Sequence, residues 1–127
     1  MKDCTISLHG STGIQLSGRD SGVENCEVFG VGGSGVSVTG GVVATLTPGK
    51  NFVRGCNIHH YSLWRRTYQP GIGWGGVGNT YTSNYIGHAP HNGILGGGGG
   101  GRVSCNCIFD NNTLDTIAYE CSDTGAL

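Results

Sequence analysis

The chain has 127 residues and a net charge of −1, and only 12% of its residues are charged. We therefore expect no nucleic-acid partner, and the apolar runs are too short to cross a membrane. Glycine contributes 26 residues without the three-residue period of collagen. This composition predicts one domain, over residues 1–127, of many short strands joined by tight turns.

Taken in chain order, the predicted strands recur about every 22 residues. Each copy begins at one column of small residues: Cys4, Cys26, Cys56, Asn84 and Asn106. A first apolar column follows two positions later: Ile6, Val28, Ile58, Ile86 and Ile108. A second contains Ile14, Val36, Ile72, Ile94 and Ile117, and glycine precedes its first four members. A third contains Val23, Val53, Tyr81 and Val103.

Three short strands in each copy predict a solenoid with a triangular cross-section. Alternation within the strands agrees, because Ile14-Gln15-Leu16 and Val36-Ser37-Val38 place their apolar residues on one face. Successive turns would stack about 4.8 Å apart as parallel strands, with like side chains above one another. No stretch shows helical periodicity with caps. The predicted fold is all-β, a parallel solenoid of five copies.

Two copies are longer than the others. One insertion lies near residues 41–50 and the other at Tyr61–Gln69. The second insertion adds large polar and aromatic side chains: Tyr61, Trp64, Arg65, Arg66, Tyr68 and Gln69. They would either contact a ligand, the aromatic rings stacking on sugar rings, or fold the insertion back onto the solenoid.

These features resemble the right-handed parallel β-helix proteins of the pectin-lyase-like superfamily. The resemblance covers nearly the whole chain at the level of the repeat, and the segments at residues 58–72, 87–94 and 122–126 resemble an uncharacterised carbohydrate-active group within it. The resemblance implies a long, extracellular solenoid that acts on polysaccharides along one face. Because no signal-peptide pattern opens the sequence and Lys2–Ile6 already reads as mid-repeat, we expect a fragment of such a protein.

The six cysteines allow a disulfide framework, but three of them share one repeat column. We expect Cys4, Cys26 and Cys56 to stack as buried, unbonded thiols, which behave as small apolar groups. The spacing of the remaining cysteines does not match a zinc site. We therefore expect no cysteine-bound metal.

The repeat register brings histidines together. Four positions after the column of small residues come His60, His88 and Asp110, so these three are predicted to stack on consecutive turns. The same reasoning pairs Gln69 with His91. Two histidines beside a carboxylate suit acid–base chemistry, and a hydrogen-bonded polar ladder is the alternative.

Carboxylates supply the other catalytic candidates. Asp110, Glu120 and Asp123 fall within the last copy, and glycosidic hydrolysis needs two such groups. A lyase would instead use His60 with Arg65, Arg66 or Tyr68, and often a calcium ion. Solubility of a terminal loop is the alternative role of the acids.

Between Val28 and Phe109 there is no acidic residue, whereas five cations fall in this span: Lys50, Arg54, Arg65, Arg66 and Arg102. Such a basic face attracts anionic polymers such as uronic-acid polysaccharides. We therefore expect part of a protein that binds a polysaccharide and, if catalytic, cleaves it as a hydrolase or lyase without a cofactor other than calcium. A non-catalytic module for surface binding or assembly is the alternative.

Overall fold

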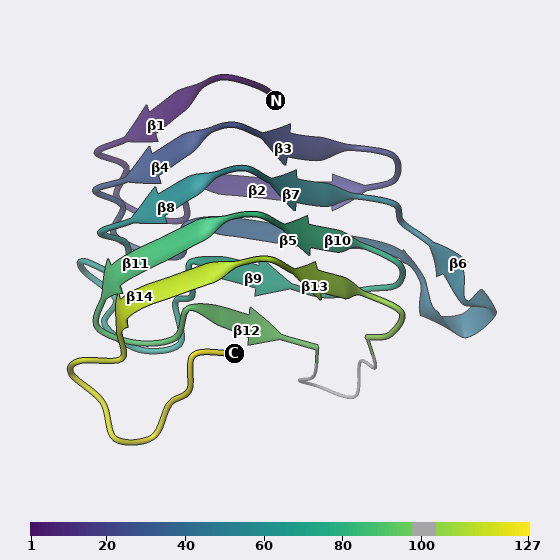
Figure 1. The fold of residues 1–127 in the computed structure, drawn as a ribbon. Helices are drawn as coiled ribbons and strands as arrows, with labels where there is room; N and C mark the ends of the chain where they lie inside the picture. The colour runs from purple at the N-terminus through teal and green to yellow at the C-terminus, as the bar shows by residue number, and fades with distance from the viewer. Residues whose placement is uncertain (98–103) are drawn as a thin grey trace.

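The computed structural model describes residues 1–97 and 104–127 and consists of three parallel sheets (Figure 1). Sheet B contains β1 (Thr5–Ser7), β4 (Glu27–Phe29), β8 (Asn57–His59), β11 (Tyr85–Ala89) and β14 (Thr113–Ile117). Sheet A contains β3 (Gly22–Glu24), β7 (Phe52–Arg54), β10 (Thr80–Thr82) and β13 (Ile108–Asp110). Sheet C contains β2 (Ile14–Gly18), β5 (Val36–Val42), β9 (Ile72–Trp74) and β12 (Ile94–Gly96).

The chain visits sheets A, B and C in turn, and each turn lies directly on the one before it (Figure 1). This arrangement confirms the predicted parallel solenoid. The registers of the first four copies are also confirmed. Ile6, Val28, Ile58 and Ile86 pair across sheet B. Ile14, Val36, Ile72 and Ile94 pair across sheet C.

The predicted register of the last copy is wrong by six residues. Leu114, not Ile108, pairs with Ile86 on sheet B. Ile108 instead pairs with Thr80 on sheet A, where its side chain is 57% exposed. The reason is that extra residues precede β13, so this copy begins 28 residues after Asn84, at Asn112, rather than at Asn106.

Two other positions of that copy change with the register. Ile117 pairs with Ala89 on sheet B and does not extend the column of Ile94. Phe109 pairs with Tyr81 on sheet A, in the place predicted for Val103, which lies outside the described residues together with Arg102.

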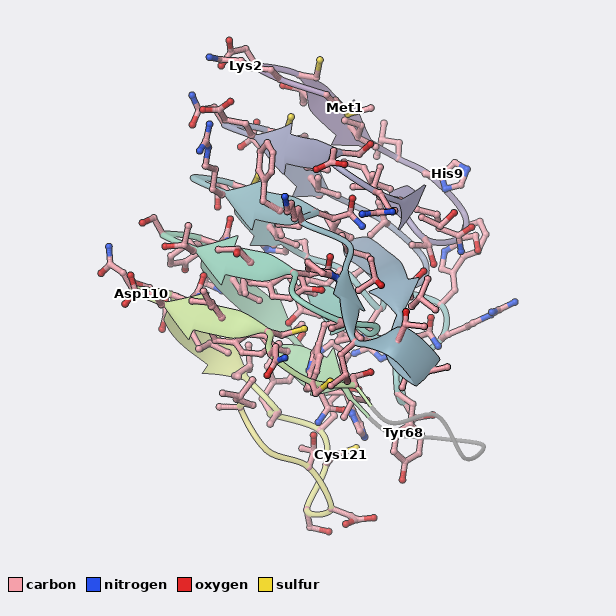
Figure 2. The ribbon with its side chains drawn as sticks, turned by 90° about the vertical axis from the view of Figure 1, so that its right-hand side faces the viewer. Met1, Lys2, His9, Tyr68, Asp110 and Cys121 are labelled. Carbon is pink, nitrogen blue, oxygen red and sulfur yellow. The ribbon has the colours of Figure 1, made fainter. Side chains whose placement is uncertain are left out.

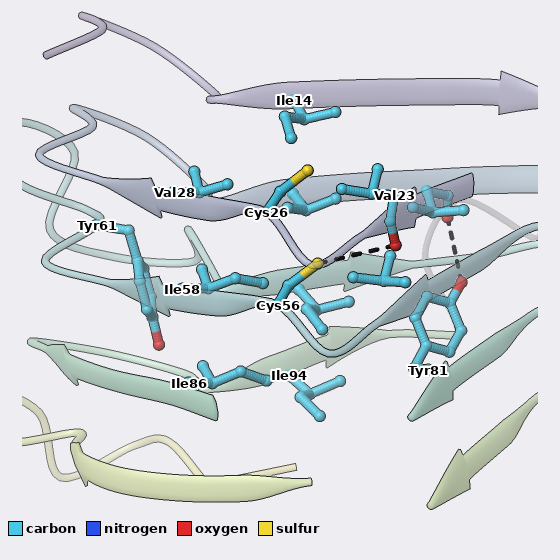
Figure 3. Close-up of a cluster of buried hydrophobic side chains, with 14 of the residues drawn as sticks. Ile14, Val23, Cys26, Val28, Cys56, Ile58, Tyr61, Tyr81, Ile86 and Ile94 are labelled. Atoms are coloured by element: carbon cyan, nitrogen blue, oxygen red, sulfur yellow. Dashed lines mark hydrogen bonds between the residues drawn. The ribbon is translucent and has the colours of Figure 1, made fainter. Parts of the chain in front are cut away.

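The core is a stack of mainly aliphatic residues from the three sheets, together with Tyr61 and Tyr81 (Figure 3). Cys26 and Cys56 are buried free thiols within it, as predicted. Cys4 is also free but exposed, so the prediction of burial is wrong for this residue. It lies next to β1, which has a neighbouring strand on one side only in this structure.

The corners of the solenoid are built from asparagines and from residues with positive φ. Asn84 accepts a hydrogen bond from the Cys56 N–H, and Asn112 accepts one from the Asn84 N–H. Asn51 and Asn79 form a similar pair at the corner between sheets C and A. The corner between sheets B and C has left-handed backbone in every turn, at Leu8, Gly30, His60, His88 and Thr116.

The glycines before the second apolar column serve close packing. A Cβ at Gly35 would lie 2.6 Å from the Gly71 carbonyl oxygen and would also contact Ile58. Steric space, rather than a positive φ, therefore explains glycine at this position.

The insertion near residues 41–50 is a hairpin that projects from the solenoid (Figure 1). β5 continues outward to Val42, a 3₁₀ turn follows at Val43–Thr45, and β6 (Thr47–Pro48) returns antiparallel to β5. No helix in the described part of the chain has the length and apolar character needed to cross a membrane.

Candidate functional site

His60 and His88 stack at the corner between sheets B and C. Their ring centroids are 5.0 Å apart with an interplanar angle of 24°. Both residues occupy the left-handed corner position, which histidine adopts more readily than most side chains do. The repeat register therefore placed this pair correctly.

A third histidine extends the pair toward the N-terminal turns. The Nδ1 atoms of His59 and His60 are 2.7 Å apart, and Nε2 of His59 lies 3.4 Å from a carboxylate oxygen of Glu27. The His59 ring also stacks on Phe29, with centroids 5.2 Å apart and planes nearly parallel. These contacts fix the orientation of His59 from two sides.

Tyr85 and Asp115 extend the pair toward the C-terminal turn. The Tyr85 hydroxyl donates to Asp115 at 2.8 Å and lies 3.4 Å from Nε2 of His88. The hydrogen bond from Tyr85 lowers the pKa of Asp115, and the same bond raises the pKa of Tyr85. Burial and the neighbouring His59 and His88 lower the pKa of His60. We call this connected set the histidine row; it contains Glu27, His59, His60, His88, Tyr85 and Asp115.

The structure places Asp110 elsewhere. It pairs with Thr82 on sheet A and points outward, on the side of the solenoid away from Tyr68 (Figure 2). The prediction that Asp110 continues the column of His60 and His88 is therefore wrong, because the last copy is shifted in register. Thr116 takes that position, and its neighbour Asp115 supplies the carboxylate.

The other predicted acids do not form a pair with Asp110. Both oxygens of Glu120 accept hydrogen bonds from Arg66, so this carboxylate is held in an ion pair. Asp123 is an exposed residue of the C-terminal segment. The three predicted acids thus lie in three different settings.

The insertion at Tyr61–Gln69 is anchored to the second turn by its backbone. The N–H groups of Ser62, Leu63 and Trp64 donate to carbonyls at Gly33, Val31 and Gly32. Tyr61 is fully buried, and its hydroxyl donates to the Asn92 carbonyl at 2.9 Å. The insertion thus folds back onto the solenoid at Tyr61, while most of its other side chains face solvent.

The indole ring of Trp64 packs against the backbone at two glycines, Gly10 and Gly32. A Cβ at Gly10 would come within 2.6 Å of the indole ring, and one at Gly32 within 3.1 Å. The side chain nevertheless remains 74% exposed. One face of the ring therefore rests on backbone while the remainder is open to solvent.

The end of the insertion contacts neighbouring turns. The Ser34 hydroxyl donates to Gln69 at 3.3 Å, and the Tyr68 ring lies 5.0 Å from the ring of His91. His91 is buried and hydrogen-bonded to Asn92, so it supports this end of the insertion. Gln69 and His91 share the same register position, as predicted, because Ile72 pairs with Ile94.

A shallow groove of about 380 Å³ lies on the outer face of sheet C. Its lining is uncharged and comes from strands β2 and β5: Gln15, Leu16, Ser17, Ser37 and Thr39. Gly10 and Gly32, which carry the Trp64 ring, lie in the connections that lead into these two strands. The ring and the groove therefore belong to the same two turns.

A family model described as the right-handed beta helix region matches residues 1–126. The chain belongs to the right-handed β-helix family. No curated protein and no solved structure gave a match. Within residues 1–97 and 104–127 of this β-helix, no group of three metal-ligating side chains is placed to hold an ion.

The charge of the β-helix is more balanced than the sequence indicated. Arg54 pairs with Glu24, and Arg66 pairs with Glu120. Acidic residues near the two ends of the sequence thus form ion pairs with basic residues between Val28 and Phe109, because stacking brings distant turns together.

Sequence reasoning missed Glu27, His59, Tyr85 and Asp115 as members of the histidine row. The segment N-Y-I-G-H at Asn84 matches N-T-L-D-T at Asn112. Aligning these two segments pairs Ile86 with Leu114, which is the observed register, and would have placed Asp115 beside His88.

Proposed function

We propose that this β-helix is part of a protein that binds a polysaccharide at the corner between sheets B and C, with Trp64 as the stacking platform. The observation that carries the proposal is the exposure of a rigidly held indole ring. Its neighbours in the chain are fixed by backbone hydrogen bonds, so the ring needs little ordering when a ligand arrives.

The solvent-facing indole suits the apolar face of a sugar ring. A tryptophan that is 74% exposed leaves a large apolar area in contact with water, and aromatic groups of this kind are enriched in binding sites. Gly10 and Gly32 allow the ring to lie flat, because any larger residue at Gly10 would displace it.

The groove on sheet C suits the hydroxyl groups of the same ligand. Gln15, Ser17, Ser37 and Thr39 offer amide and hydroxyl groups, each of which is able to donate and accept hydrogen bonds. The uncharged lining favours neutral sugar units here, and Arg65, exposed beside Trp64, is available to an acidic substituent. Such a ligand would place the whole protein outside the cell.

Binding is better supported than hydrolysis. Hydrolysis would require two free carboxylates on either side of the scissile bond, at about 5 to 9.5 Å from one another. Asp110 lies on sheet A, away from this corner, and Glu120 is ion-paired with Arg66, so neither of these two acids is free at the proposed binding site. A non-catalytic binding module is therefore the form of the proposal that the geometry favours.

The test compares Trp64→Ala with a matched control, Phe52→Ala. Phe52 is an outward aromatic residue on sheet A, and its ring also lies over a glycine, Gly22. Binding to a panel of soluble neutral and uronic-acid polysaccharides would be measured by affinity electrophoresis. Loss of an aromatic platform worth about 1 to 1.5 kcal/mol should weaken binding about five- to tenfold in Trp64→Ala alone. Equal binding by the wild type and Trp64→Ala, or equal losses in both variants, would contradict the proposal.

A further inference from the structure

The histidine row consists of two hydrogen-bonded segments, each with a carboxylate at its outer end, that meet where His60 stacks on His88. Glu27 lies beside His59 at one end, and Asp115 accepts from Tyr85 at the other. The stacked pair of His60 and His88 lies between them. The groove and Trp64 take no part in these contacts, so the row is a separate feature.

The carboxylate of Glu27 determines where the protons of the two neighbouring imidazoles lie. An ionised carboxylate only accepts hydrogen bonds, so Nε2 of His59 must be the protonated nitrogen that faces Glu27. In neutral His59, Nδ1 then has the lone pair and accepts a hydrogen bond. The Nδ1 atom of His60, 2.7 Å away, must therefore carry the proton.

The same reasoning applies at the other end. Tyr85 donates its only proton to Asp115, so its oxygen is left to accept from Nε2 of His88. Neutral His88 thus keeps its proton on Nε2. The two stacked rings are consequently opposite tautomers.

We propose that Glu27 and His59 hold His60 in the Nδ1-protonated tautomer and so present its Nε2 lone pair to an outside ligand as a proton acceptor. The ligand is one that brings a hydroxyl group to this corner. It donates a hydrogen bond to Nε2 and, where it is acidic enough, transfers its proton there. His59 and Glu27 are positioning residues, because they act through His60.

Three further observations support this role. Phe29 stacks on His59, which fixes the ring that sets the tautomer. His60 is exposed to solvent, so a ligand can approach it. Partial burial of the ring and the adjacent imidazoles lower the pKa of His60, which favours the neutral ring with its lone pair.

His9 provides an internal comparison. The Ser11 N–H approaches Nδ1 of His9 at 3.4 Å, so neutral His9 accepts at Nδ1 and has its proton on Nε2. It is therefore an exposed histidine of the same chain in the opposite tautomer. His60 and His9 should differ in every measurement that detects a free Nε2.

The first measurement is the ¹⁵N chemical shift of the imidazole nitrogens in the wild-type chain at pH 7.5. His60 should show a pyridine-like Nε2 and a pyrrole-like Nδ1, and His88 the reverse.

The second measurement is acylation by diethyl pyrocarbonate, followed by peptide mass mapping. Nε2 attacks a carbonyl carbon of the reagent, the new N–C bond forms as the C–O bond to the carbonate group breaks, and the departing ethyl carbonate takes up the Nδ1 proton and decomposes to ethanol and carbon dioxide. His60 should react several-fold faster than His9.

The variant His59→Phe keeps the stack on Phe29 but removes both nitrogens. His60 should then lose its tautomer preference, and its acylation rate should fall to that of His9. Tyr85→Phe is the control at the other end of the row and should leave His60 unchanged. A protonated Nε2 on His60 in the wild type would overturn the proposal even if His59→Phe failed to fold. An unchanged tautomer and rate in folded His59→Phe would overturn the role of the positioning residues.

Discussion

At the scale of single residues, buried asparagines connect one turn to the next. Asn84 is 1% exposed, and its side chain bonds to groups of the turn before it and of the turn after it. Its oxygen accepts from the Cys56 N–H, and its amide donates to the Val53 carbonyl and to Asn112. An amide suits this place because it donates and accepts within one planar group.

Replacing Asn84 with alanine should therefore destabilise the fold strongly. The Cys56 N–H would stay buried without a partner, which costs about 1 to 3 kcal/mol in the free energy of unfolding. Asn57→Ala is the control, since Asn57 is exposed and should change stability by less than about 0.5 kcal/mol. Urea denaturation of the three proteins checks the prediction, and equal midpoints for all three would contradict it.

His60 predicts a dependence of stability on pH. Its pKa in the folded chain lies below the ordinary value of 6.5, so the unfolded chain binds more protons between the two values. The free energy of unfolding should consequently fall as the pH drops through and below 6.5, and recover above it. His60→Asn, which tolerates the left-handed backbone, should show a weaker fall. Melting temperatures measured from pH 5 to 8 test this, and parallel curves for the two proteins would refute the assignment to His60.

At the scale of elements, the two insertions differ in how they meet the solenoid. The insertion at Tyr61–Gln69 buries Tyr61 and bonds to the second turn, whereas the hairpin of β5 and β6 exposes apolar residues at its tip. Leu46 at this tip is 59% exposed and has φ of 54°, which is unfavourable for leucine. The tip therefore contributes strain rather than core packing.

The variant Leu46→Asn should stabilise the chain. Asparagine adopts the left-handed conformation more readily, and the gain should be about 1 kcal/mol in the free energy of unfolding. Ala44→Asn, two residues earlier in the 3₁₀ turn, controls for the polarity of the new side chain. Calorimetry measures the thermal stability of both variants against that of the wild type. A stability gain of the same size in Ala44→Asn would show that backbone conformation is not the cause.

At the scale of the whole molecule, the fold was predictable because a solenoid repeats its local rules. Inward Ile and Val columns and outward polar neighbours specify parallel stacking turn after turn, and four turns follow the predicted register. The columns of Ile58 and Ile72 are therefore both correct. The stacking of His60 on His88 follows from the same rule.

The last turn was not predictable from spacing alone. Both Ile108 and Leu114 fit the apolar column of Ile86. The register with Leu114 is the one in which Asn112 accepts a hydrogen bond from the Asn84 N–H. The ends of the histidine row depend on that register. Side-chain contacts between turns, such as that of Arg66 with Glu120, have no signal in the sequence because they join residues 54 positions apart.

The central claim is that the outer side of sheet B carries one connected row that ends at Asp115, which requires the six-residue shift of the last turn. The most direct test is the pKa of Tyr85, followed through the ¹³Cζ resonance of labelled tyrosine. The hydrogen bond to Asp115 raises that pKa. Asp115→Asn should consequently bring it down toward the ordinary value, whereas Asp110→Asn, on sheet A, should leave it unchanged. A drop in Asp110→Asn, or none in Asp115→Asn, would contradict the register and the row built on it.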